Sequence, residues 1–279
     1  LYVHYPFCVR LCHFCHCHVM ISRNKKRIDS FLDILLKEID MLQEFFEKNS
    51  LELNFKDIHL GGGSPSYLDE EGFDLLIDKL GSLLDMDKLV EFSIEVDPRT
   101  VTPSKICHYS EKGINRLSFG IQDFNPAVQK AIDRVQPLEE VEALISPDIR
   151  KKFESINFDL MFGLPHQTRE SFQETIDNVI RILPERIALF HFNHRTDIFE
   201  NHSLIKDNDL PGEYEKSMIN IEAISRLLDA GYERVGLDHF ALPQDTLAQA
   251  AQAGTVSRNF NGYTRGGTVD LIGVGPSAI

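Results

Sequence analysis

Four of the five cysteines of this chain lie within ten residues, in the run PFCVRLCHFCHCH. Cys8, Cys12, Cys15 and Cys17 follow C-x3-C-x2-C-x-C spacing, which is too tight for a helix to present all four thiolates on one face. A loop can wrap such a set around one polynuclear metal centre, and thiolates are the usual ligands of soft metals and iron–sulfur clusters. If three thiolates hold a [4Fe–4S] cluster, one iron has no protein ligand and can bind a substrate or cofactor. The pattern therefore indicates a catalytic metal centre.

Zinc and disulfides are the other common uses of cysteine. Zinc sites usually pair two ligand sets a dozen or more residues apart, whereas this set is local. His13, His16 and His18 interleave with the cysteines and keep a Cys/His zinc loop as an alternative. A disulfide framework is disfavoured in a chain of 279 residues with five cysteines. Metal-bound thiols in a reducing compartment fit better, so we expect a cytoplasmic protein.

The charge balance restricts the partners. Acidic residues number 43 against 29 basic ones, and the net charge of −14 argues against a general nucleic-acid surface. An anionic substrate would need a local basic pocket. No apolar run reaches the length of a membrane span, and no signal-peptide pattern precedes the cysteines. The chain begins at Leu1 and ends at Ile279 in a Gly-rich turn, so we expect further segments on both sides.

Strands and helices are predicted to alternate after the cysteines. Strands are predicted at residues 1–5, 56–60, 90–96, 116–120, 156–161, 186–192 and 234–237, and helices at 28–46, 72–84, 103–112, 126–133, 138–153, 168–183, 211–230 and 242–253. Such alternation implies parallel strands with crossover helices. The predicted fold class is α/β, with residues 1–279 as one incomplete (β/α)6-type barrel. Its active site should lie at the carboxyl ends of the strands.

Three further motifs lie at predicted strand ends. The run GGGSPS (61–66) follows a strand and is either a ligand-binding loop or a tight turn; it lacks the Gly-Lys of a phosphate loop. Glu95 ends the next strand. Asp159 lies within an apolar strand, where an unpaired carboxylate is costly. Its partner is either a cofactor group or a structural ion pair, for instance with Arg134.

Taken together, these motifs resemble the oxygen-independent coproporphyrinogen III dehydrogenases, a family within the radical S-adenosylmethionine (SAM) superfamily. The resemblance covers the chain in order, through YVHYPFCVRLCHFCHC, HLGGGSPS, SIEVDP, RLSFGIQDF, INFDLMFGLP, LDHFA and RNFNGYT. The cysteine motif alone implies only the superfamily, and the later motifs make the branch specific. The family's N-terminal arm and C-terminal helical domain have no counterpart in these residues.

The resemblance implies a radical SAM reaction in haem biosynthesis. A [4Fe–4S] cluster would reduce SAM, and the resulting 5′-deoxyadenosyl radical would take a hydrogen from a propionate of coproporphyrinogen III. Loss of CO2 and one electron would leave a vinyl group, giving protoporphyrinogen IX. The cofactors carry this chemistry, and the protein positions them. The family also implies a tetrapyrrole substrate, a reductant such as flavodoxin or ferredoxin, and a monomer.

The same resemblance implies the roles of individual residues. The cluster would be ligated by Cys8, Cys12 and Cys15. The first SAM would be lined by Tyr2, Gly62, Glu95 and Ile279, with Glu95 holding its ammonium group. A second SAM, or the substrate side, would be contacted by Phe14, Gly63, Ser64, Gln122, Arg134, Asp159 and Asn193. Cys17 matches a family cysteine that does not bind iron, and would act in a relay or be structural.

Three residues depart from the family pattern. His16 stands where a glycine is usual, Asn193 replaces a small residue, and Arg195 adds a charge. These departures keep a sister enzyme as an alternative function: a two-SAM methyltransferase or a haem-degrading relative acting on another substrate. A non-catalytic haem-chaperone relative is a further alternative, although such proteins usually lack the cysteine present here as Cys17.

Overall fold

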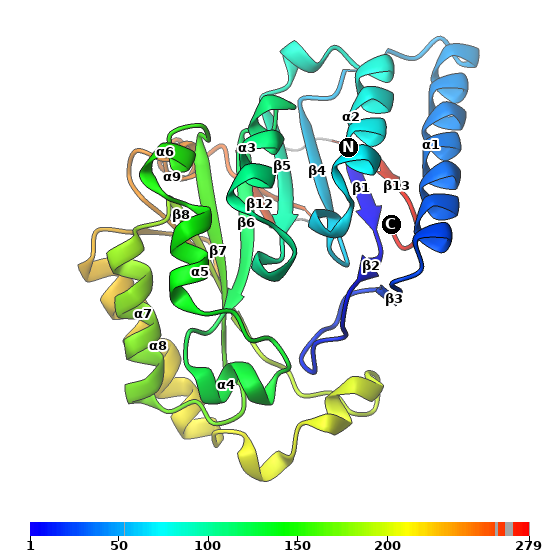
Figure 1. Cartoon of the computed structure of the whole chain (residues 1–279). Helices are drawn as coiled ribbons and strands as arrows, with labels where there is room; N and C mark the ends of the chain where they lie inside the picture. Colours follow the sequence, from blue (N-terminus) through cyan, green and yellow to red (C-terminus); the bar gives the residue numbers. More distant parts are fainter. Residues whose placement is uncertain (53, 260–261, 266–269, 279) are drawn as a thin grey trace.

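An open, mostly parallel sheet forms the centre of the molecule. In the computed structural model, which describes residues 1–52, 54–259, 262–265 and 270–278, nine strands pair in the order β13-β1-β4-β5-β6-β7-β8-β10-β9 (Figure 1). Six of them run parallel in chain order: β1 (Tyr2–Tyr5), β4 (Asp57–Gly62), β5 (Glu91–Val96), β6 (Arg116–Gln122), β7 (Ser155–Phe162) and β8 (Arg186–His191). The described strands do not close on themselves, which confirms the predicted incomplete (β/α)6 architecture.

The two faces of this sheet differ in polarity because side chains alternate along each strand. Leu117, Phe119 and Ile121 of β6 enter the main hydrophobic core, as do the alternate apolar residues of β4, β5 and β7. Ser118 and Gln122 of β6 line cavities on the opposite face. The polar residues that interrupt these apolar strands therefore lie inside the half-barrel.

The helices connect successive strands. They are α1 (Lys25–Lys48), α2 (Glu70–Leu83), α3 (Pro103–Glu111), α4 (Pro126–Ala131), α5 (Leu138–Leu144), α6 (Pro147–Arg150), α7 (Arg169–Ile182), α8 (Glu213–Asp229) and α9 (Thr246–Gln252). Side-chain caps begin several of them: the Asn24 side chain accepts from Arg27 N–H, and Thr168 forms a capping box with Ser171. Among the described residues, no helix has both the length and the apolar composition that crossing a bilayer requires.

Two of the predicted helices differ from those in the structure. The helix predicted over residues 138–153 is divided into α5 and α6, because Pro147 starts a new helix and disfavours helical backbone at the residue before it. The last predicted helix, over 242–253, is shorter and begins at Thr246, where the Asp245 side chain caps its first turn.

The parallel order also ends at one edge of the sheet. β9 (Glu233–Val235) and β10 (His239–Ala241) form an antiparallel hairpin, and β10 pairs antiparallel with β8. At the other edge, β13 (Gly273–Val274) pairs parallel with β1. The remaining short pairs are β2 (Phe7–Cys8) with β3 (Met20–Ile21), and β11 (Ser257–Asn259) with β12 (Gly262–Thr264). A three-residue strand carries too little periodicity to reveal its direction.

The cysteines lie at the carboxyl edge of the sheet. The chain leaves β1 through β2 into the cysteine loop, which Figure 1 shows in blue at the same end of the molecule as α4. The backbone N–H of His13 donates to the carbonyl of Ile132, immediately after α4, at 3.0 Å. The fold therefore brings the cysteine loop against a segment more than a hundred residues away in the sequence.

Candidate active site

A cavity of about 310 Å³ opens at the carboxyl edge, and the cysteine loop forms one wall of it. Its predicted members are Cys8, Cys12, Phe14, Cys15, Cys17, Gly62, Gly63, Ser64, Glu95, Gln122, Arg134 and Asp159. These residues come from β2 and the cysteine loop, and from β4, β5, β6 and β7 or the residues directly after them, except Arg134, which follows α4. Twelve of the fifteen predicted site residues thus share one cavity.

The other three have different positions. Tyr2 is buried on β1, where its hydroxyl is 3.1 Å from Nδ1 of His4 and its ring stacks on His59. Asn193 is exposed, and its backbone carbonyl is 3.2 Å from Nε2 of His16. Ile279 lies outside the described residues. Neither Tyr2 nor Asn193 belongs to the lining of the cavity.

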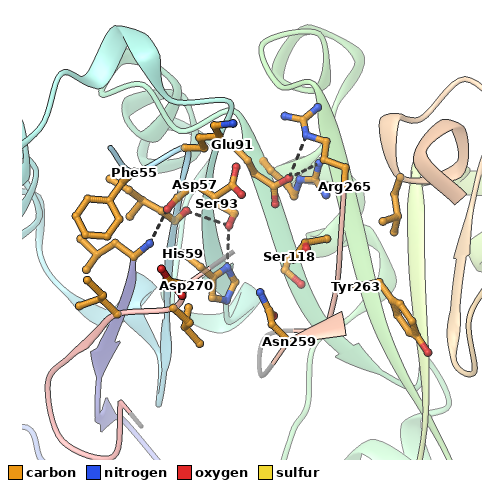
Figure 2. A pocket seen from close by; sticks show the side chains of 18 of the residues that line it. Phe55, Asp57, His59, Glu91, Ser93, Ser118, Asn259, Tyr263, Arg265 and Asp270 are labelled. Atoms are coloured by element: carbon orange, nitrogen blue, oxygen red, sulfur yellow. Dashed lines mark hydrogen bonds and ion pairs between the residues drawn. The ribbon is translucent and has the colours of Figure 1, made fainter. Parts of the chain in front are cut away.

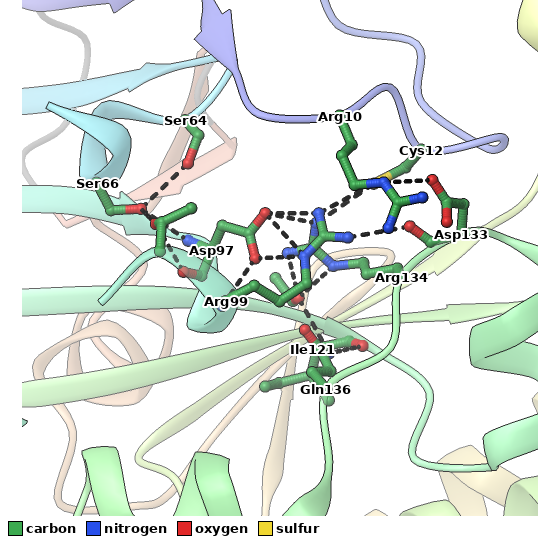
Figure 3. A network of polar contacts seen from close by, with 12 residues as sticks. Arg10, Cys12, Ser64, Ser66, Asp97, Arg99, Ile121, Asp133, Arg134 and Gln136 are labelled. Carbon is green, nitrogen blue, oxygen red and sulfur yellow. Dashed lines mark hydrogen bonds and ion pairs between the residues drawn. The ribbon is translucent and has the colours of Figure 1, made fainter. Parts of the chain in front are cut away.

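A buried ionic network lies against Cys12 (Figure 3). The Asp97 carboxylate is 2.7 Å from Nη2 of Arg99 and 3.3 Å from Nη1 of Arg134. Both guanidiniums also donate to Sγ of Cys12, at 3.4 and 3.6 Å. Burial opposes the ionisation of Asp97, but the charges of Arg134 and Arg99 outweigh it and hold the pKa at about 2. The network therefore places positive charge beside a thiol that a metal centre would bind as thiolate.

The thiols of the loop differ in acidity. Burial raises the pKa of the Cys8 thiol to about 12. A hydrogen bond with Cys17 lowers the pKa of the Cys15 thiol to about 7. The backbone N–H of Cys17 also donates to Sγ of Cys15, at 3.4 Å. All five cysteines have free thiols, so the disfavoured disulfide framework is absent.

The glycines of the GGGSPS run allow close packing against the cysteine strand. A Cβ on Gly63 would lie 2.4 Å from the carbonyl oxygen of Pro6 and 3.1 Å from Sγ of Cys8. Gly62 has a φ of +121°, and a Cβ there would lie 2.8 Å from the carbonyl oxygen of Tyr5. Only glycine avoids both the overlap and the strain. These glycines are required first for chain packing, and Gly62 and Gly63 also line the cavity.

Glu95 is held at the end of β5 by two contacts. Its Oε1 is 3.2 Å from Nε2 of His59, and its Oε2 accepts from the backbone N–H of Gly62 at 3.2 Å. A carboxylate has about four acceptor positions, so this one retains capacity towards the cavity that it lines.

Asp159 is paired with neutral groups. Its carboxylate accepts from Ser118 Oγ at 3.0 Å and from Asn157 Nδ2 at 2.8 Å. Burial, and then the charge of Glu95, raise its pKa to about 6. The alternative ion pair with Arg134 was wrong, because Arg134 binds Asp97 and the carbonyl of Gly120. Asp159 therefore faces the cavity without a cationic partner among the described residues.

Gln122 has an unusual backbone. Its φ is +66°, at a register irregularity between β6 and β7, and its Oε1 is buried without a hydrogen-bond partner among the described residues. Strained backbone and unsatisfied buried acceptors concentrate at functional sites. The β-bulge re-aims this side chain, which lines the cavity.

The donor set fits a polynuclear cluster better than a single ion. Among the described residues, no three His, Cys, Asp or Glu side chains converge on one metal position. A [4Fe–4S] cluster does not require this, because each of its cysteines binds a different iron. Cys8, Cys12 and Cys15 surround one cavity, with two arginines beside the most buried thiol. The structure therefore gives no support to the Cys/His zinc loop.

A second, larger cavity of about 580 Å³ lies at the amino ends of the strands (Figure 2). It is lined by Asp57, Glu91, Arg116 and Arg186, which begin their strands, and it contains no thiol. Ser118 lines both cavities. The thiols therefore line only the smaller of these two cavities, and the larger one continues the interior of the half-barrel.

Two functional positions were missed by the sequence predictions. Arg99 binds Cys12 and Asp97, and its position two residues after Asp97 in SIEVDPR was the available signal. Asn201 donates to the cysteine loop from 186 or more residues away, in a segment with no recognisable motif. A contact between residues so far apart in the sequence can be found only from the fold.

Comparison with known proteins agrees with this geometry. The model of the radical SAM superfamily matches residues 2–179. The oxygen-independent coproporphyrinogen III oxidase of Salmonella typhimurium is 41% identical over 279 residues, which is all of this chain and 60% of the relative. The protein of the same name from Pseudomonas aeruginosa is 38% identical over 281 residues, again covering 60% of its length.

A solved structure of a coproporphyrinogen III oxidase shows the similarity in three dimensions. Coproporphyrinogen III oxidase from Escherichia coli, described as a radical SAM enzyme, superposes with a TM-score of 0.94 at 40% identity. The match covers 99% of this chain and 63% of that one. The chain thus spans about three fifths of the length of these relatives.

Proposed function

The chain belongs to the radical SAM superfamily, whose members use a [4Fe–4S] cluster and SAM, and on this premise we propose that it converts propionates of coproporphyrinogen III to vinyl groups. The product would be protoporphyrinogen IX, in haem biosynthesis without oxygen. The observation that carries the proposal is the single cavity that joins three cysteines to Glu95, Arg134 and Asp159. The identity of about 40% along the chain to enzymes named for this reaction supports it.

Cys8, Cys12 and Cys15 would hold the cluster. When bound, the cluster and SAM supply a one-electron reductive cleavage that generates a hydrogen-abstracting radical. The guanidiniums of Arg99 and Arg134 donate to Sγ of Cys12, so their positive charge would lie beside the cluster. Cys17 would remain outside the ligand set, and its N–H donates to Sγ of Cys15. Hydrogen bonds to cluster sulfurs tune the reduction potential.

Glu95 would bind the ammonium group of the first SAM, beside Gly62 and Tyr2. His59 and the Gly62 N–H already orient its carboxylate, so little side-chain entropy would be lost on binding. Ile279 belongs to the same proposed set by family resemblance alone.

The remaining lining residues would hold a second SAM or the substrate. This set consists of Phe14, Gly63, Ser64, Gln122, Arg134 and Asp159. Gln122 offers an unsatisfied acceptor, and Asp159 can hold or release a proton near neutral pH. Both would gain from a donor or cation that the protein itself does not provide. Asn193 would join this set through its position beside His16.

The proposal includes a reducing, cytoplasmic compartment, a protein reductant such as flavodoxin or ferredoxin, and a monomer with residues 1–279 as the catalytic half-barrel. Five free thiols are consistent with a reducing compartment.

Anaerobic assay of the reconstituted protein tests the function. The protein is incubated with coproporphyrinogen III, SAM and a strong reductant, and protoporphyrinogen IX is measured. Cys12→Ser should abolish the product, whereas Cys107→Ser, in α3 away from the cavity, should retain it. SAM cleavage without protoporphyrinogen would overturn the proposal, and formation of S-adenosylhomocysteine would point to a methyltransferase instead.

A further inference from the structure

Residues 192–205 lie across the cysteine loop and bind its backbone. Nδ2 of Asn201 is 3.1 Å from each of three carbonyl oxygens, those of Cys12, His13 and Cys15. Three acceptors around one atom identify it as the amide nitrogen, which shares its two N–H bonds among them. One side chain therefore binds almost the whole turn between the second and third cysteines.

His202, which is fully buried, binds the carbonyl that Asn201 leaves free. Its Nδ1 accepts from the backbone N–H of Arg195 at 2.9 Å. That contact leaves the proton on Nε2, which is 3.3 Å from the carbonyl oxygen of Phe14. Asn201 and His202 thus bind four consecutive carbonyls of the loop, those of residues 12–15.

His16 adds further contacts between the two segments. Its ring stacks on Phe199, with 4.5 Å between ring centroids, and lies 4.7 Å from the ring of His202. Its Nε2 is 3.2 Å from the carbonyl oxygen of Asn193. The three departures from the family pattern, His16, Asn193 and Arg195, therefore belong to one contact between this segment and the cysteine loop.

The bound carbonyls determine the direction of the peptide N–H groups. Each trans peptide points its N–H opposite to its carbonyl, and the described chain contains no cis peptide. Carbonyls turned towards Asn201 and His202 turn the following N–H groups away from them. The N–H groups of His13 and Cys15 bind the carbonyls of Ile132 and Cys12. Those of Phe14 and His16 have no acceptor among the described residues.

We propose that Asn201, supported by His202, is a positioning residue that turns the N–H groups of Phe14 and His16 towards the sulfurs of the cluster. This inference rests on the proposed function only in taking Cys8, Cys12 and Cys15 as cluster ligands. N–H donors raise the reduction potential of an iron–sulfur cluster, and such supporting contacts also increase metal retention. Asn201 does not line the cavity and would act through the backbone of the cysteine loop.

The test compares Asn201→Asp and Asn201→Ala with Asn208→Asp. Asn208 is exposed in the same part of the chain, so its variant controls for the added charge. Reconstituted proteins, without SAM or tetrapyrrole, are assayed for iron release to a chelator and for cluster midpoint potential by EPR-monitored titration. Losing two or three neutral hydrogen bonds should accelerate iron release about tenfold and lower the potential. Asn208→Asp should match the wild type.

The outcomes separate this inference from the proposed function. The inference would be overturned if both Asn201 variants released iron at rates within twofold of Asn208→Asp and had midpoint potentials equal to its potential within error. The proposed function would be left intact. A wild-type protein that binds no iron would overturn both. Asn201 is only partly buried, so the variants should fold, and Asn201→Ala provides the result if the charged variant does not. A change in Asn201→Asp alone would indicate charge rather than positioning and would also overturn the inference.

Discussion

Replacing Asp97 by asparagine tests the buried ionic network next to the cysteines. Asp97 pairs with Arg99 at 2.7 Å, and only 12% of its side chain is exposed. Asparagine has the shape of the protonated acid and keeps one acceptor, but it removes the charge that both arginines face. The variant is therefore equivalent to protonating Asp97 within the folded protein.

The size of the effect follows from the acidity of the carboxyl. The arginines lower the pKa of Asp97 from 3.8 to about 2 against the effect of burial. A shift of nearly two pKa units corresponds to about 2.5 kcal/mol of unfolding free energy at neutral pH. Removing one partner of a buried ion pair typically costs about 3–5 kcal/mol. We therefore expect Asp97→Asn to lower the unfolding free energy by about 3 kcal/mol.

The pair Asp197–Arg195 provides a matched control. Its N–O distance is also 2.7 Å and its partners are also two residues apart, but 64% of the Asp197 side chain is exposed. An exposed ion pair contributes at most about 1 kcal/mol. Urea unfolding of the reduced, metal-free proteins should therefore show a large loss for Asp97→Asn and a small one for Asp197→Asn.

The pH dependence identifies the charge as the cause. Because the pKa of Asp97 is lowered on folding, its contribution is complete above the unfolded value of 3.8 and is lost as the pH falls through about 2. The stability gap between the wild type and Asp97→Asn should thus be constant from pH 7 to 5 and fall by about half at pH 3. Equal losses in the two variants, or a gap independent of pH, would refute the reasoning.

Two other substitutions follow from the same cavity. Burial raises the pKa of Asp159 to about 6. Its ionisation therefore lowers the unfolding free energy of the cofactor-free protein as the pH rises from about 4 to 6. Asp159→Asn should therefore raise the unfolding free energy, measured by urea unfolding at pH 8, by about 2–3 kcal/mol. The same variant should bind SAM more weakly when binding is measured by calorimetry. A loss of stability would contradict this reasoning. Gly63→Ala should displace Cys8 and lower the iron content, because its Cβ would meet Pro6. Gly81 lies inside α2, and a Cβ there would be 3.7 Å from its nearest neighbour. Gly81→Ala should therefore keep full iron content and gain about 0.5–1 kcal/mol of unfolding free energy. Equal iron loss in the two variants would argue against the packing role of Gly63.

Most of the fold was predictable because it depends on local patterns. The six parallel strands carry alternating or continuous apolar residues, and their helices carry a 3.6-residue period. The errors occurred where this signal is weak: at Pro147, which divides an otherwise helical pattern, and at the three-residue strands β9 and β10. Periodicity reports which face of an element is buried, and it does not report the direction of a strand.

The site shows the same division. Cysteine spacing, the glycine run and Glu95 could each be recognised from neighbouring residues, and the parallel order placed them at one edge. The partner of Asp159 could not, because a cofactor group and an ion pair with Arg134 were both compatible with the sequence. Only packing shows that Arg134 is already bound to Asp97, leaving Asp159 to neutral groups.

By itself, the sequence predicted a cluster of cysteines, the half-barrel and the edge of the sheet where the candidate site lies, because these follow from residue type and short-range spacing. Only the tertiary structure decided what surrounds the thiols: Arg99 and Arg134 beside Cys12, and Asn201 on the loop carbonyls. Hydrogen bonds and ion pairs act over about 3 Å. Residues separated by 87 to 189 positions come within that range only when the sheet places their segments together.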